Sequence, residues 1–231
     1  KFQFVQFHPS YDYTDFVEGL RPYQKEGSND IGFKLEPGIF YSFCQDALED
    51  KENNYVFVID EINRGEISKI FGELFFSVEP SYRGPKGNVT TQFANLHKEE
   101  NEFDRMTTDN KRKGNFFVPE NVFIIATMND IDRSVENLDF AFRRRFPTEY
   151  IKWDDTLDSI LETLTISFKE EAKEALTRLN QAIAEEEELG EDYTIGGAYL
   201  LHLKDMGDAN SSLEAFWNSY LGTIINEYLK G

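Results

Sequence analysis

The stretch YVFVIDE, residues 55–61, decides the fold class. It is an apolar run that ends in two acids, and a short apolar run between polar residues predicts a strand buried inside a sheet. A second run of this kind, NVFIIATMND, covers residues 121–130. A stretch with helical spacing separates the two runs, so we expect an α/β domain with a mostly parallel sheet.

The segments around these runs predict helices, a further strand and two irregular stretches. From Glu66 to Val78 apolar residues recur every third or fourth position before Pro80, which predicts one amphipathic helix. Residues 38–50 also have helical spacing, and the opening KFQFVQF alternates as a strand does. We interpret residues 23–29 as a loop, and residues 81–115 as a hairpin or long insertion outside the core.

The last third of the chain has helical spacing only. A helix expected from Ser134 ends in the arginines 143–145, and a domain boundary is expected near Trp153. We therefore expect an α/β core at residues 1–152 and a small helical lid at residues 153–231.

Charge and composition limit the classes of function. The chain has 24 Lys and Arg against 43 Asp and Glu, a net charge of −19, which disfavours direct binding to nucleic acid or anionic lipid. Cys44 is the single cysteine, and His8, His97 and His202 lie far apart, so neither a disulfide nor a zinc site is expected. Without a long apolar run or a signal pattern, the sequence predicts a cytoplasmic protein.

Asp60 and Glu61 follow the first buried strand directly. Ligands of α/β sheets bind at the carboxyl ends of strands. The pair is therefore a candidate to hold Mg²⁺ through Asp60 and to orient and polarise an attacking water through Glu61. The alternative is that the two acids cap the next helix and charge its first turn.

Asn129 and three consecutive arginines are the other candidates. A neighbouring strand would bring the Asn129 amide near the two acids, where it can bond a γ-phosphate or its water; alternatively, Asn129 only turns the chain. Arg143, Arg144 and Arg145 cannot all face one way on a helix. One of them can serve as an arginine finger for a neighbouring subunit, or all can complement the helix dipole.

Taken in order, VFVIDEINRGEISKIFGELF (56–75) and VPENVFIIATMNDIDRSVENLDFAFRRRF (118–146) resemble the McrB-type GTPases of modification-dependent restriction systems. These belong to the AAA+ superfamily, so the resemblance implies an AAA+ P-loop-type sandwich, its N-terminal part truncated, followed by an all-α lid. Asp60 and Glu61 resemble the Walker B pair, and Asn129 the sensor-1 position. MNDIDRS (128–134) resembles the MNxxDRS signature that is associated with GTP.

The resemblance carries further expectations about cofactors, partners and residues. It implies GTP, with ATP less favoured, together with Mg²⁺, a hexameric ring, an McrC-type endonuclease partner, and DNA translocation coupled to cleavage. DNA would be met only through the assembly or another domain. Asp132 and Arg133 would shape the surroundings of the catalytic water, and Arg64 would be an interface cation. The arginines 143–145 resemble the finger region.

Two departures from the family keep alternatives open. The sequence has no GxxxxGKS or GxxxxGKT loop for the phosphates; by resemblance this loop belongs upstream of Lys1, and the chain alone would bind nucleotide poorly or not at all. Gly197 and Ala198 stand where relatives are more often polar. The alternatives are an AAA+ ATPase that remodels other partners, and a catalytically silent scaffold subunit.

Overall fold

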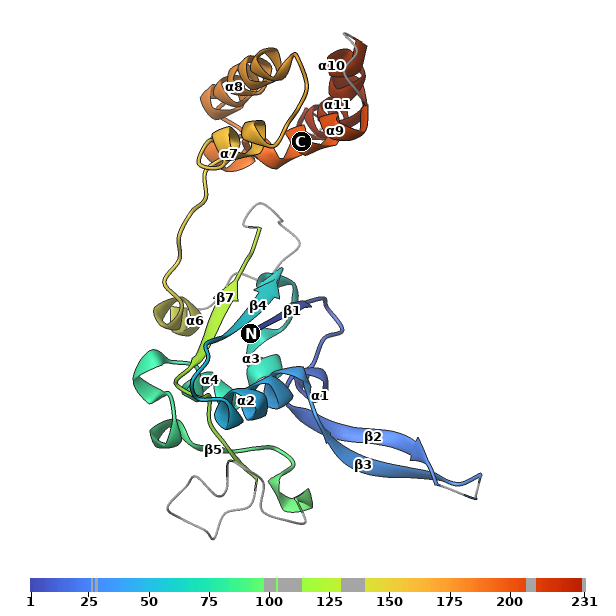
Figure 1. Cartoon of the computed structure of the whole chain (residues 1–231), viewed down its shortest axis with the longest axis vertical. Helices are drawn as coiled ribbons and strands as arrows, with labels where there is room; N and C mark the ends of the chain where they lie inside the picture. The colour runs from blue at the N-terminus through green and yellow to red at the C-terminus, as the bar shows by residue number, and fades with distance from the viewer. Residues whose placement is uncertain are drawn as a thin grey trace. The chain divides into compact units, whose positions relative to one another are not determined.

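The computed structural model describes residues 1–25, 27, 29–97, 103, 114–129, 140–206 and 211–229. The chain divides into two compact units, Lys1–Thr148 and Glu149–Gly231 (Figure 1). Each unit has its own cluster of buried apolar side chains. Every strand of the described residues lies in the first unit, and so does every candidate site residue that the structure describes.

Three parallel strands form the main sheet of the first unit. They are β1 (Phe2–Gln6), β4 (Tyr55–Asp60) and β7 (Val122–Ala126), in the order β1-β4-β7. Both apolar runs are thus strands, and the predicted α/β fold with a parallel sheet is confirmed. Parallel neighbours need crossover connections, and successive right-handed crossovers in one direction place their helices on one face of the sheet.

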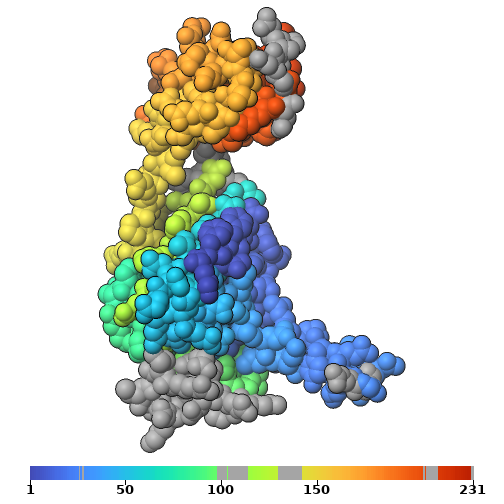
Figure 2. Space-filling model, in the orientation of Figure 1, coloured from blue at the N-terminus to red at the C-terminus, as the bar shows by residue number. Residues whose placement is uncertain are grey.

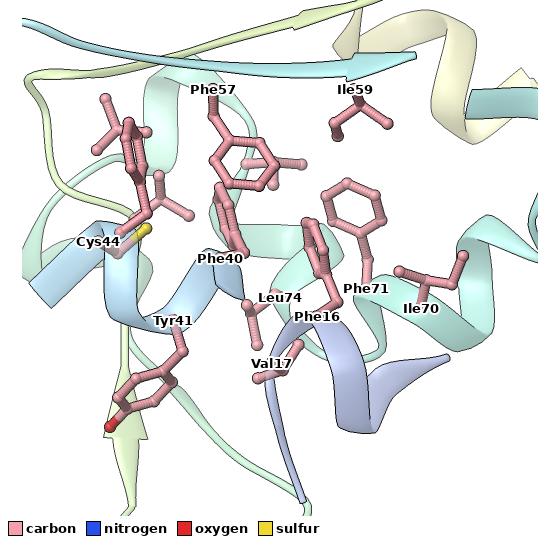
Figure 3. Packing of buried hydrophobic residues seen from close by; sticks show 14 of the residues in the cluster. Phe16, Val17, Phe40, Tyr41, Cys44, Phe57, Ile59, Ile70, Phe71 and Leu74 are labelled. Carbon is pink, nitrogen blue, oxygen red and sulfur yellow. The ribbon is translucent and has the colours of Figure 1, made fainter. Parts of the chain in front are cut away.

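Helices cover the face to which Tyr55, Phe57 and Ile59 point. These are α1 (Tyr13–Phe16), α2 (Ile39–Glu49), α3 (Ile67–Phe71) and α4 (Leu74–Ser77). The Phe40 ring of α2 stacks on Phe16 with a centroid distance of 4.7 Å, and meets Phe57 edge-on at 5.0 Å (Figure 3). This aromatic core fixes β4, and with it the position of the acids at its end.

The opposite face of the sheet carries exposed apolar side chains. Phe2 is 65% exposed, Phe4 51%, Phe123 50% and Ile125 53%. The strand register places Phe2, Val56 and Phe123 in one row and Phe4, Val58 and Ile125 in the next. Parallel sheets are normally covered on both faces, so this outer face is the unusual feature of the unit.

The helix predicted from Glu66 to Val78 is interrupted, and in this respect the prediction was wrong. α3 ends at Phe71, Gly72 has a φ of 51°, and α4 begins at Leu74. A side chain at Gly72 would approach the Tyr13 ring to 3.0 Å and adopt a strained backbone conformation. The apolar periodicity continues through the break, which is why the sequence predicts one helix.

Residues 18–24 and 31–37 form an antiparallel hairpin, and a loop was predicted for residues 23–29. β2 (Glu18–Gln24) pairs in antiparallel fashion with β3 (Ile31–Pro37), and the hairpin projects from the body of the unit (Figures 1 and 2). Pro22 is tolerated because each strand of a two-stranded ribbon is an edge strand. The connection between β2 and β3 is therefore shorter than the predicted loop.

The segment 81–115 is partly a hairpin, as predicted, but one of its residues belongs to the core. β5 (Val89–Thr90) pairs with β6 (Asn115–Phe116), and Phe103 is fully buried against Tyr41 and Phe116. The expectation that the segment lies outside the core is wrong at Phe103. Its short helical turns are Pro80–Tyr82, Pro85–Gly87 and Ala94–Leu96.

The second unit is helical throughout its described residues. Asn180, buried on its longest helix, bonds both backbone groups of Ile195, at 2.9 and 2.7 Å. The helices are α7 (Leu157–Glu162), α8 (Lys169–Glu185), α9 (Leu203–Met206), α10 (Ser211–Phe216), the π-helix Trp217–Leu221 and α11 (Gly222–Tyr228), with 3-10 turns at Glu191–Tyr193 and Gly197–His202. Among the described residues, no helix is both long and apolar enough to cross a membrane.

Candidate functional site

Asp60 is the last residue of β4 and lies between two polar residues of the flanking strands. It pairs with Gln6 of β1 in the strand register, and Thr127 follows β7 on its other side. Gln6 Nε2 donates to Asp60 Oδ2 at 3.1 Å, and Thr127 Oγ1 donates to Asp60 Oδ1 at 2.5 Å. The carboxylate is thus held at the carboxyl edge of the sheet, where ligands of α/β folds bind.

Glu61 has a backbone conformation that non-glycine residues rarely adopt. Its φ is 53° and its ψ 45°, and it is the one described non-glycine residue with a positive φ. Such strain tends to occur at functional sites. Its side chain accepts a hydrogen bond from Arg64 Nε at 3.1 Å. Arg64, predicted to be an interface cation, therefore contacts Glu61 of its own chain, and its role stays a prediction.

Asn129 is connected to the turn that follows Asp60. Asn63 is 7% exposed, and its Nδ2 donates to the backbone oxygen of Asn129 at 3.0 Å. The backbone also joins the two segments, since Ile62 N donates to Thr127 O at 2.9 Å. The structure thus brings Asp60, Glu61 and Asn129 to adjacent strand ends, as the sequence predicts; the chemical role of each stays a prediction.

The three arginines at the end of α6 (Phe140–Arg145) differ in their surroundings. The Arg145 guanidinium lies over the Phe75 ring, 4.5 Å from its centroid, and its Nε is 3.9 Å from Glu79 Oε2. Arg143 and Arg144 are exposed. Asp132 and Arg133, predicted from the signature, lie outside the described residues, as does the start of the helix expected from Ser134.

Gln6, Asn63 and Thr127 were not identified from the sequence. Gln6 lies in an alternating strand, Asn63 in the turn after the two acids, and Thr127 just before Asn129. The only available signal was proximity in sequence to the candidates, and for Gln6 even that was lacking. Their contacts depend on which strands are neighbours.

The described residues fit a magnesium ion that arrives with a phosphate ligand. They contain no group of three or more His, Cys, Asp or Glu side chains that could hold a metal by itself. Mg²⁺ prefers oxygen ligands, keeps several waters, and is usually bound by one or two carboxylates together with substrate phosphates. A single oriented carboxylate, Asp60, at an exposed edge matches that use.

Comparisons with known proteins identify the family of the chain. Residues 1–146 match the family model described as AAA domain (dynein-related subfamily), and residues 171–231 match McrB, alpha-helical lid domain. The chain is 39% identical over 203 residues to the type IV methyl-directed restriction enzyme EcoKMcrB subunit of Escherichia coli (strain K12), covering 84% of the chain and 39% of that protein.

A second relative is the type II restriction enzyme BsuMI component YdiS of Bacillus subtilis (strain 168). It is 26% identical over 168 residues, which cover 64% of the chain and 47% of that protein. The chain thus spans less than half the length of both relatives. The family matches and the parallel sheet together confirm the resemblance that the motifs indicated. The chain belongs to the dynein-related subfamily of AAA domains and carries an McrB-type helical lid.

Proposed function

We propose that the chain is the water-activating part of a GTP-hydrolysing motor in a type IV restriction system. The observation that carries the proposal is the position of Asp60, Glu61 and Asn129 at the carboxyl ends of two neighbouring parallel strands. A carboxylate that can hold Mg²⁺, a second that can orient a water, and an amide beside them are among the groups that support phosphoryl transfer from a nucleotide to water.

Each of the three residues has a separate task. Asp60 presents a fixed negative charge to the nucleotide's cation, and Mg²⁺, when bound, neutralises charge on the phosphates. Glu61 accepts a proton from the attacking water, once its side chain leaves Arg64. Asn129 donates its amide hydrogens to the γ-phosphate or to that water. These assignments need a nucleotide held in front of the sheet edge.

The exposed outer face of the sheet is evidence for a phosphate-binding loop and helix that another part of a longer protein would contribute. A crossover helix runs antiparallel to the strands, so a helix on this face would start at the carboxyl edge, above Asp60. A helix N-terminus there binds phosphate, and its apolar side would cover Phe4, Phe123 and Ile125. We propose that the GxxxxGKS or GxxxxGKT loop and its helix occupy this position.

The arginines at the end of α6 are candidates to act on the nucleotide of a neighbouring subunit in a ring. Arg145 is engaged with Phe75 and Glu79 of its own chain. Arg144 is exposed and makes no ion pair or hydrogen bond with the described residues. We therefore assign the finger role to Arg144, which would neutralise charge that develops on the nucleotide of the neighbouring subunit.

We infer the nucleotide, the endonuclease partner and the coupling to DNA from the McrB-type signature and from the charge of the chain. The Escherichia coli relative is named a subunit of a methyl-directed restriction enzyme, and the MNDIDRS signature favours GTP over ATP. With a net charge of −19, contact with DNA would come through the assembly or another domain. The McrC-type endonuclease is the partner that we expect to stimulate turnover.

Steady-state hydrolysis of GTP and ATP by the longer protein, measured beside the present chain with and without the endonuclease, tests the proposal. We expect Mg²⁺-dependent GTP turnover by the longer protein and none by the chain alone. A preference for ATP would instead indicate an AAA ATPase that remodels other partners. Absence of turnover in every combination would contradict the motor function and favour a silent scaffold.

A further inference from the structure

Three polar residues continue the outer face of the sheet as a third row. In the register, two apolar rows are followed by Gln6 opposite Asp60. Thr127 continues β7 beside Asp60, because its N–H donates to Ile59 O at 2.9 Å. The row lies at the carboxyl edge, where the outer face ends, and all three side chains are at least partly exposed to solvent.

Both oxygens of the Asp60 carboxylate accept a hydrogen bond from this row. Gln6 Nε2 lies 3.1 Å from Oδ2, and Thr127 Oγ1 lies 2.5 Å from Oδ1. The terminal torsion of an aspartate has a broad distribution, so an isolated carboxylate at a sheet edge would rotate. Donors on two sides restrict that rotation and leave each oxygen one further acceptor position.

We propose that Gln6 and Thr127 are positioning residues that hold Asp60 in the orientation required by the hydrated Mg²⁺ of the nucleotide. The inference rests on the proposed function and assigns two further residues to the same site. Both donors are uncharged, so they orient Asp60 without cancelling its charge. A lysine or arginine in either position would pair with the carboxylate and compete with the cation.

The types of the two residues suit this task. Thr127 is β-branched and its χ1 angle is therefore stiff, which fixes its hydroxyl toward Oδ1. Gln6 is long enough to reach across the interval between neighbouring strands, which is about 4.8 Å. Partners of metal ligands typically change metal affinity or activity by about 10- to 100-fold when they are removed.

The test uses the longer protein with its phosphate-binding loop, in the variants Gln6→Leu and Thr127→Val. Binding of a fluorescent GTP analogue is titrated with Mg²⁺ and repeated in EDTA, and turnover is followed against Mg²⁺ concentration. We expect the Mg²⁺ concentration for half-maximal binding to rise about 10-fold or more in each variant. Metal-free binding and the melting temperature should stay unchanged.

Two further variants separate positioning from a general structural effect. Thr127→Ser keeps the hydroxyl but loses the β-branch that stiffens χ1, so its Mg²⁺ dependence should lie between that of the wild type and that of Thr127→Val. Gln3→Leu is the matched control, because Gln3 lies on the same strand and, among the described residues, its amide donates to Phe4 O at 3.3 Å and not to Asp60. It should change neither binding nor turnover.

Unaltered Mg²⁺ dependence in both Gln6→Leu and Thr127→Val, in an active protein, would overturn the inference and leave the proposed function intact. An equal loss of binding with Mg²⁺ and in EDTA would also overturn it, since that result indicates a structural role. A wild-type protein that binds no nucleotide would overturn the proposed function, and the inference with it.

Discussion

The side-chain amide of Asn63 donates to the backbone oxygen of Asn129 at 3.0 Å, and thereby connects the turn after β4 to the segment after β7. Asn63 is 7% exposed, and its Oδ1 is buried without a hydrogen-bond partner among the described residues. A buried amide that holds one neighbouring backbone fixes the spacing between Glu61 and Asn129. That spacing decides whether both can contact the same water.

Replacing Asn63 with alanine should destabilise the chain and disturb the site. The substitution removes the hydrogen bond that the Asn63 amide donates to Asn129 O. We therefore expect the free energy of unfolding to fall by about 1 to 3 kcal/mol. Urea denaturation measures it. The matched control is Asn53→Ala, because Asn53 is exposed and its amide bonds Asp50; its effect should stay within about 0.5 kcal/mol. Equal effects of the two variants would refute the bridging role.

The arginines at the end of α6 should separate into a structural residue and a finger. Arg145→Ala should lower the melting temperature, because the guanidinium packs on Phe75 and such contacts contribute about 0.5 to 2 kcal/mol. Arg144→Ala should leave stability unchanged and lower turnover in the proposed ring by about 1,000-fold or more.

Mixing subunits tests whether Arg144 acts on a neighbour. A mixture of Arg144→Ala and Glu61→Gln subunits contains sites with an intact Glu61 and an Arg144 from the adjacent subunit. Turnover should therefore return in the mixture, although each variant alone is inactive. Failure of rescue in every mixing ratio would point to a role of the arginine within its own subunit.

The outer face of the sheet should respond differently in the chain alone and in the longer protein. Phe123→Ser removes a side chain that is 50% exposed in the chain, so stability should hardly change and binding of a hydrophobic dye should decrease. In the longer protein the same change should cost about 1.5 to 3 kcal/mol. Phe33→Ser on the hairpin is the control, with no difference between the two proteins. Equal effects of Phe123→Ser in both would argue against a covering helix.

Stability should decrease in alkaline solution because of a buried thiol. Burial raises the pKa of Cys44 well above its ordinary value of 9.0, so the folded state keeps the proton that the unfolded chain releases. The stability that the protonated thiol contributes is therefore fully present below pH 9 and declines as the pH rises above that value. Urea midpoints between pH 8 and 10 measure this decline, and Cys44→Ala should flatten it. A slope unchanged by that substitution would assign the decline to other groups, such as Tyr11, whose pKa burial raises to about 12.

The strand ends could be predicted because the apolar runs are visible in the sequence and the helical stretch between them favours a parallel sheet. Asp60 and Asn129 each follow an apolar run, and parallel neighbours end at the same edge. Gln6 and Thr127 could not be found in this way. Their contacts require the strand order, and an alternating strand does not specify its neighbours.

Other features depended on local backbone geometry and tertiary contacts. The break at Gly72 and the left-handed conformation of Glu61 are features of the local backbone, which apolar spacing does not encode. The polar residues after Pro22 indicated a loop, whereas the hairpin accommodates the proline at an edge. The contact of Arg145 with Phe75 depends on the packing of α6 near α4. These two helices are far apart in the sequence, so the contact could not be predicted from it.

The most direct test of the hydrolytic role is the variant Glu61→Gln in the longer protein, with GTP binding and GTP hydrolysis measured on the same sample. The amide keeps the size of the side chain but cannot accept a proton from water. Nucleotide affinity should remain within a few-fold of the wild type, while turnover should fall by about 100-fold or more. Turnover at the wild-type rate would contradict the assignment of Glu61 as the residue that activates water.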